Sequence, residues 1–222
     1  MFGDRQYYTF LAGVPRLPRF DRAERLPIHR ERLQRRLGLL AEPDRRAVEQ
    51  VARLLTWRRP PSSDAAFLEA GRAVLDASPS AEVRDLVRFR LSLRVVVAAL
   101  RARQQERVPA VRALLAGSPV ELALRWDEPD LGLARGLRWV TAAREHIATG
   151  RARALDSLLL GVAWDDLTRR ESGRPFSLLA CLAYVLKWDV LDRWFTYDDA
   201  QARQRFETLA LEALSEHAQR SG

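Results

Sequence analysis

Apolar residues recur at helical spacing through most of this chain. From Val83 to Ala99 they stand three or four positions apart, as they do on one face of an α-helix. This pattern belongs to the longest predicted helix, which we expect to start at Ser78-Pro79 and to run to about Arg107. Strand–helix alternation and paired hairpin signals are both missing from the pattern. The sequence therefore predicts an all-α fold, a multi-helix bundle.

Proline, glycine and capping residues set the expected bounds of the other elements. The apolar run Tyr7–Ala12 fits a strand, a short buried helix or an extended arm, and the proline-containing stretch 13–27 is expected to be irregular. The chain is taken as one helical domain, 1–222, with a sub-boundary near 108–130. The other predicted helices are 27–40, 43–57, 63–77, 109–116, one that starts at the capping box Ser118-Pro119-Val120-Glu121, 130–149 with a stop at Gly150, 152–171, and a last one from Thr196 or Asp198 to Gln219.

One further helix is predicted to start at Pro175, because proline suits the first turn of a helix. Residues 176–186 are apolar on nearly every side, so this helix should be buried all round. The run is too short to cross a bilayer. It carries Cys181, the only cysteine, and it is followed by Lys187, the only lysine. We expect Cys181 to be a structural, inert thiol, because it lies among apolar residues.

Composition places the chain among soluble globular proteins. Its 222 residues are 47% hydrophobic and 30% charged, enough for a core that needs no disulfide. A single cysteine cannot form an internal disulfide, the first residues lack the pattern of a signal peptide, and no apolar run reaches transmembrane length. These features predict a cytoplasmic protein.

The net charge of +8 comes almost entirely from arginine. Of the 37 basic residues only Lys187 is a lysine, and asparagine is absent altogether. The codon bias of a GC-rich genome produces this composition, so the isoelectric point of about 10.7 does not by itself indicate phosphate binding. Arginine still attracts polyanions, which leaves weak non-specific nucleic-acid binding as an expectation and a basic helical nucleic-acid-binding protein as the alternative function.

Catalytic motifs are missing from the sequence. It contains neither a phosphate-binding glycine-rich loop nor a metal-binding histidine pair, and His29, His146 and His217 fall in separate predicted helices. The acidic pairs 165–166 and 198–199 are neighbours on a helix and point in different directions. We therefore predict a non-enzymatic protein with no catalytic residue, no cofactor and no metal site.

Two sets of residues are candidates for binding a partner. Trp188, Leu191 and Phe195 share one helical face, for which core packing is the first interpretation and an exposed aromatic contact the second. Arginines of the longest helix form a polar stripe, either a solvated face or a docking face for an acidic partner. The candidate docking residues are Arg84, Arg88, Arg94 and Arg101.

Both ends of the chain resemble one family. The start, Tyr7-Tyr8-Thr9-Phe10-Leu11-Ala12-Gly13-Val14-Pro15 with Leu17, resembles the opening of an uncharacterised bacterial family that accompanies V/A-type ATPases. The segment from Pro175-Phe176-Ser177-Leu178 through Ala183-Tyr184-Val185-Leu186 to Arg193-Trp194-Phe195 is similar to that family's closing segment. It also resembles the last helical unit of the C-type subunit of V/A-type ATPases, which is known as the d-type subunit in eukaryotes.

This resemblance implies a role in proton or sodium transport without an active site of its own. The C-type subunit is a funnel of three related helical bundles that joins the central rotor stalk to the membrane ring, and this shorter chain has room for about two. The implied function is an assembly or coupling component with central-stalk and membrane-ring proteins as partners. The implied location is peripheral, at the cytoplasmic face of the membrane.

Overall fold

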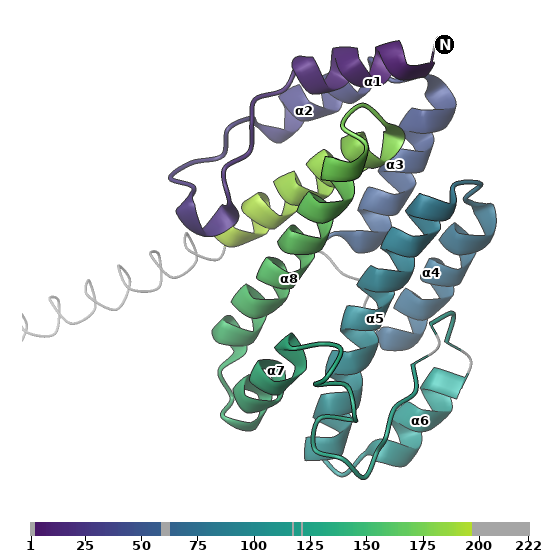
Figure 1. The fold of residues 1–222 in the computed structure, drawn as a ribbon, viewed down its shortest axis with the longest axis vertical. Coiled ribbons are helices and arrows are strands. Elements are labelled where there is room, and N and C mark those ends of the chain that lie inside the picture. The colour runs from purple at the N-terminus through teal and green to yellow at the C-terminus, as the bar shows by residue number, and fades with distance from the viewer. Residues whose placement is uncertain (1–2, 59–62, 117, 121, 197–222) are drawn as a thin grey trace, which may run out of the picture.

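The computed structural model describes residues 3–58, 63–116, 118–120 and 122–196, and within these ranges all regular structure is helical (Figure 1). The prediction of an all-α multi-helix bundle is confirmed. No helix of these ranges is both long enough and apolar enough to span a membrane. The elements are α1 (Gly3–Ala12), the 3-10 helix η1 (Phe20–Arg22), α2 (Arg30–Leu37), α3 (Glu42–Leu55), α4 (Asp64–Ala77), α5 (Ala81–Gln104), α6 (Val108–Ala116), α7 (Trp139–Ala148), α8 (Ala152–Gly173), and a helix over 178–196.

Helix α5 is the central element of the bundle and packs against α3, α4, α6 and α7. Ser80 forms its N-cap, since its hydroxyl oxygen accepts a hydrogen bond from the backbone N–H of Val83 at 3.3 Å, so the predicted start at Ser78-Pro79 is slightly early. Its first half contributes Leu86 and Leu91 to one hydrophobic core. Its second half contributes Val96 and other residues to another.

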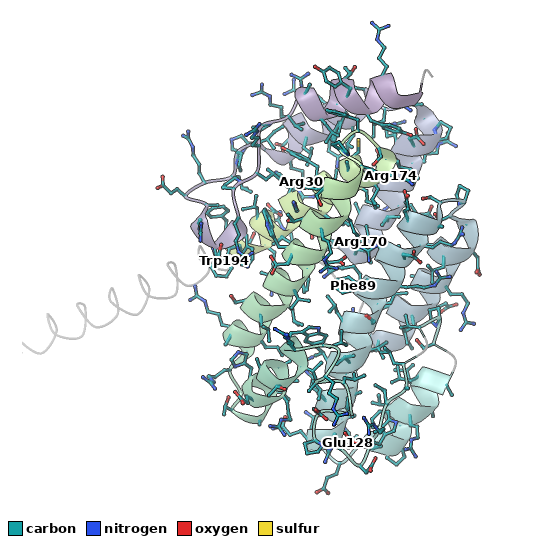
Figure 2. The ribbon with its side chains drawn as sticks, viewed as in Figure 1. Arg30, Phe89, Glu128, Arg170, Arg174 and Trp194 are labelled. Carbon is teal, nitrogen blue, oxygen red and sulfur yellow. The ribbon has the colours of Figure 1, made fainter. Side chains whose placement is uncertain are left out.

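The two cores involve different partners of α5. The first contains residues of α1 to α4 and of the 178–196 helix. The second contains residues of α7 and the first turns of α8. A smaller third cluster joins Phe20 to α8 and the 178–196 helix, where the ring centroids of Phe20 and Trp194 are 5.1 Å apart (Figure 2). The sub-boundary near 108–130 covers α6 and part of the loop after it, and stays a prediction.

The 178–196 helix is buried continuously from Leu179 to Asp192. The expectation of an all-round buried helix is confirmed, and the burial extends beyond Leu186. Its start is not at Pro175: Ser177 caps it by accepting a hydrogen bond from the Ala180 N–H at 3.2 Å, and Phe176 is 48% exposed. The expected capping role of Thr196 is also wrong, because Thr196 is helical and donates its hydroxyl to the Asp192 carbonyl at 2.7 Å.

The N-terminal arm is helical and packs on the 178–196 helix. Phe10 of α1 is fully buried, and its ring makes an edge-on contact with the ring of Tyr184 at a centroid distance of 6.0 Å. The Tyr184 hydroxyl donates to the Pro15 carbonyl at 2.9 Å, and the Trp188 indole N–H donates to the Ile28 carbonyl at 2.7 Å. The segment after α1 is irregular as predicted, apart from η1, and the next helix begins at Arg30 instead of Pro27.

Residues 118–138 contain no helix in their described part. The sequence instead predicts one helix from the capping box at Ser118 and a separate one from Asp130. The Ser118 hydroxyl accepts from the Val120 N–H at 3.1 Å, which forms a local turn. Leu131 and Gly132 have φ of 57° and 71°, which ends any helical path there, and Leu131 is fully buried in the second core. Helix α7 therefore begins only at Trp139, and the predicted stop at Gly150, with φ of 66°, is confirmed.

Two other predictions fall wholly or partly outside the described residues. The last predicted helix, with Asp198 at its start and Gln219 at its end, lies outside the described residues. Most of the loop predicted between α3 and α4 also lies outside them. Its far end is described, and there the predicted capping residue Ser63 accepts from the Ala66 N–H at 3.1 Å.

Candidate partner-binding cleft and the buried charges beside it

The 178–196 helix presents a buried carboxylate, Asp189, to the end of α3. Its side chain is 8% exposed and accepts hydrogen bonds from the Thr56 hydroxyl at 2.8 Å and the Trp57 backbone N–H at 2.7 Å. Helix α3 ends at Leu55, so Asp189 fixes the turn that follows it. Burial raises the pKa of Asp189, while the two hydrogen bonds and the positive charge of Arg90 lower it.

Arg90 of α5 lies next to this carboxylate. Burial lowers the pKa of its guanidinium to about 10, against an opposing effect of Asp189 and Asp166. Arg90 donates to the Leu55 carbonyl at 3.2 Å, and its guanidinium carbon is 4.0 Å from the centroid of the Trp57 ring. Arg90 is thus held by a carbonyl and a ring.

Asp192 lies one turn further along the same helix and accepts from two arginines. Arg30 of α2 donates at 2.8 Å and Arg58 at 3.2 Å. The Arg30 guanidinium also covers the Trp188 ring at 4.8 Å (Figure 2). This pair of arginines connects α2 and the end of α3 to the buried helix.

A further buried carboxylate, Asp166, lies on α8 and pairs with two arginines of the same helix. It is 1% exposed and accepts from Arg170 at 2.6 Å and Arg169 at 3.2 Å. Figure 2 shows Arg170 beside Phe89 of α5, at 5.8 Å from guanidinium carbon to ring centroid. The buried Lys187 pairs with Glu171 on the same helix as Asp166. These contacts give each of the buried charges a partner, as their burial requires.

A cleft of about 660 Å³ opens beside Arg90 and is strongly basic. Its floor is apolar and is formed largely by α5, with Leu93 and Val97 among its residues. Five arginines and two aspartates provide its charges. They are Arg90, Arg94, Arg101, Arg107, Arg193, Asp64 and Asp156.

Both aspartates of the cleft are already bound to arginines of the cleft. Arg94 pairs with Asp64 at 2.6 Å and also covers the Phe67 ring at 4.6 Å. Arg193 pairs with Asp156 at 2.7 Å. Arg90 interacts with the charges of Asp189 and Asp166. The charges that no carboxylate of the cleft balances belong to the exposed Arg101 and to Arg107, which binds the neutral side-chain amide of Gln105.

The predicted docking arginines do not form one surface. Arg94 and Arg101 line the cleft. Arg84 instead donates to the Ser78 carbonyl at 2.6 Å, and Arg88 pairs with Asp85 on the exposed side of α5 at 3.1 Å. With about 3.6 residues per turn, Arg84 and Arg88 lie roughly a third of a turn away from the cleft.

Sequence reasoning missed part of this cleft. The i, i+4 and i+11 spacing of Arg90, Arg94 and Arg101 along one helix was a usable signal. No sequence signal brings Arg193, which lies far along the chain, to the same cleft, and none shows that Asp156 pairs with it.

A second groove, of about 690 Å³, lies between α2 and α3 over the 178–196 helix. It borders the cleft at Thr56 and carries charges of both signs, among them Arg53 and Glu49. Because its charges are mixed, it has less electrostatic preference for one kind of partner.

The other candidate residues occupy packing or surface positions. Cys181 is fully buried, and burial raises the pKa of its thiol to about 12, in agreement with an inert structural cysteine. Trp188 and Leu191 are core residues, as expected. His29 is exposed and His146 is partly buried, while His217 lies outside the described residues. Among the residues that the structure describes, no group of three His, Cys, Asp or Glu side chains is arranged to hold a metal ion.

Comparison of the chain with protein-family models, with curated proteins and with solved structures gives no match in any of the three. The resemblance to a V/A-type ATPase family therefore rests on the residues at the two ends that carry it.

Proposed function

We propose that this chain is a non-enzymatic assembly or coupling component of a V/A-type rotary ATPase, a socket of the C-type (eukaryotic d-type) kind between the central stalk and the membrane ring. One observation carries the proposal. The two segments that resemble the family, residues 7–17 and 175–195, pack directly on each other through Phe10, Tyr184 and Pro15. The residues that carry the resemblance therefore belong to one packed unit of the fold.

The physical character of the molecule supports a role in binding. A socket for a rotating shaft must resist deformation, and here the 178–196 helix, buried from Leu179 to Asp192, contacts α1, α2, α3 and α8 through packing and paired charges. Its arginine-rich cleft complements acidic loops, and charge complementarity directs association and fixes orientation. The proposed location is the cytoplasmic face of the membrane, bound to the ATPase.

Affinity purification from the organism that encodes the chain tests this proposal. A tagged chain should elute from detergent-solubilised membranes together with the rotary ATPase, and its deletion should reduce ATP-driven ion pumping in membrane vesicles. The same tag on an unrelated protein of similar charge controls for non-specific binding by arginine. If the chain never co-elutes with the ATPase and its deletion leaves pumping unchanged, the proposal is wrong.

A further inference from the structure

We propose that the cleft beside Arg90 binds an acidic, amphipathic segment of a partner protein, with Arg101 and Arg107 as its main charged contacts. The inference rests on the proposed function in one respect only, since it assigns the segment to a protein of the rotary ATPase. The chemistry of recognition follows from the cleft alone.

Charge balance defines the first requirement on the partner. The two cleft aspartates are bound by Arg94 and Arg193, at 2.6 and 2.7 Å. Positive charge on the exposed Arg101 and Arg107 is left without a carboxylate of the cleft to balance it, whereas the buried Arg90 interacts with Asp189 and Asp166. A ligand with at least two carboxylates supplies that balance, and carboxylates fit the planar guanidinium with two parallel hydrogen bonds.

The shape of the cleft defines the second requirement. Arg90, Arg94 and Arg101 follow one face of α5 and span about 16 Å, at about 1.5 Å of rise per residue. The floor between and beside them is apolar, with Leu93, Val97 and Leu159. A segment with glutamates on one stripe and leucines on the adjoining stripe satisfies both the row of arginines and this floor.

The cleft is organised before any partner binds. The Arg94 guanidinium is held between the Asp64 carboxylate and the Phe67 ring, and Arg90 lies between the Leu55 carbonyl and the Trp57 ring. Side chains that are already fixed lose little conformational entropy on binding. The conformational entropy lost on binding therefore comes mainly from the exposed side chains of Arg101 and Arg107.

The same contacts argue against a single-stranded nucleic acid in this cleft. Sequence-tolerant binding of single strands needs aromatic faces on which bases can stack. Here the Trp57 and Phe67 rings are covered by the guanidinium groups of Arg90 and Arg94. A protein segment needs no free ring.

Fluorescence anisotropy with labelled synthetic peptides tests the proposal at about 0.15 M salt, where long-range attraction between exposed charges is largely screened. The first probe is a peptide of about four helical turns with glutamates at i, i+4, i+7 and i+11 and leucines on the adjoining stripe. The second has glutamine for each glutamate, and the third is polyglutamate of equal charge. We expect only the first probe to bind measurably below about 1 mM, and inorganic triphosphate to compete weakly.

The matched variants are the double variant Arg101→Gln/Arg107→Gln and the double control Arg84→Gln/Arg88→Gln, which removes the same charge outside the cleft. Arg88 and Arg101 are exposed on the same helix, but only Arg101 lines the cleft. The double variant should lose about tenfold or more in affinity for the first probe, the scale of a lost hydrogen bond to a charged group. The control should stay within about twofold.

Three results would overturn the inference. The first is no binding of the first probe up to about 1 mM. The second is equal loss in the Arg101→Gln/Arg107→Gln variant and in the Arg84→Gln/Arg88→Gln control. The third is equal or tighter binding of triphosphate or a labelled oligonucleotide. Failure of the proposed function looks different. If the chain binds the first probe through Arg101 and Arg107 but never co-elutes with the ATPase, the cleft assignment stands and the choice of partner complex is wrong.

Discussion

Tyr184 donates its hydroxyl hydrogen to the carbonyl oxygen of Pro15 at 2.9 Å, across 169 residues of chain. The tyrosine is 8% exposed, and burial raises the pKa of its hydroxyl, so it remains a donor at every physiological pH. Pro15 directly follows the turn that ends α1, and its carbonyl finds its partner in the buried helix. This bond, with the edge-on contact between Phe10 and Tyr184, fixes the N-terminal arm on the body of the protein.

Replacement of Tyr184 by phenylalanine should reduce the free energy of unfolding by about 1 to 2 kcal/mol, because the Pro15 carbonyl loses its donor while the ring contacts remain. Urea unfolding followed by circular dichroism measures the change. Tyr8→Phe is the matched control, since the Tyr8 side chain is 57% exposed, and its effect should stay within about 0.5 kcal/mol. Equal effects of the two variants would contradict this role of the Tyr184 hydroxyl.

Asp189 should give stability an unusual dependence on pH. In the folded chain, burial raises the pKa of this carboxyl group above its ordinary 3.8. Between pH 3.8 and the folded pKa, the folded chain therefore binds more protons than the unfolded chain. The contribution of Asp189 to the free energy of unfolding falls across that range. The stability deficit of Asp189→Asn should accordingly be largest in acid and shrink as pH rises.

Glu42→Gln provides the opposite case for the same measurement. Hydrogen bonds from Arg45 and Arg46 lower the pKa of Glu42 below its ordinary 4.5. The contribution of Glu42 to the free energy of unfolding is therefore present above pH 4.5 and is lost as pH falls through the folded pKa. The deficit of Glu42→Gln should grow with rising pH. Urea unfolding of both variants between about pH 3 and 7 tests the pair, and slopes of the same sign would contradict the assignment for Asp189.

Cys181 should act only through packing. Its thiol is fully buried with a pKa of about 12, so labelling by iodoacetamide near neutral pH should require denaturant. Cys181→Ala should cost about 1 to 2 kcal/mol of stability through the small cavity that it leaves. Binding of the acidic peptide probe should be unchanged. If the variant folds but loses partner binding, the structural assignment of this cysteine is wrong.

Gly71 allows close contact between α4 and α5. A Cβ atom at this position would lie 2.7 Å from Cδ2 and 2.8 Å from Cδ1 of Leu91, which is fully buried and would have to shift within a packed core. Gly71→Ala should therefore destabilise the fold by about 1 to 3 kcal/mol.

The control is Gly161→Ala in α8, where the nearest atom to the new Cβ is Nη2 of Arg19 at 3.7 Å. This substitution should stabilise by up to about 1 kcal/mol, because alanine favours the helix and no contact is disturbed. Thermal unfolding of both variants gives the comparison. A stabilising effect of Gly71→Ala would show that the two helices can separate without cost.

Local signals in the sequence predicted several helix ends correctly. They failed where packing in the hydrophobic core determines the backbone conformation. Ser63 caps α4 as its pattern predicted, and its hydroxyl accepts a hydrogen bond from the Ala66 backbone N–H. Ser118 carries a fuller capping signal, yet its hydroxyl bonds Val120 and forms a turn. The nearby Leu131 is fully buried at a positive φ, a conformation with an intrinsic cost that burial in the second core offsets.

The sequence predicted only part of the candidate site. Arg94 and Arg101 were named from their place on the longest helix, and the structure places both in the cleft. Helical spacing also sets Arg84 and Arg88 away from that face, so it could have excluded both from the docking residues. It did not show that Arg193 and Asp156, from two other helices, complete the wall, since such contacts depend on tertiary packing.

The contact between α1 and the 178–196 helix also sets the order in which the protein can fold on the ribosome. Pro15 leaves the ribosome 169 residues before Tyr184, an interval of roughly 10 to 30 s at usual rates of synthesis. Throughout that time Phe10 lacks the Tyr184 side of its packing, although it is fully buried in the finished fold. This part of the apolar surface of the arm is therefore covered only after the buried helix is made.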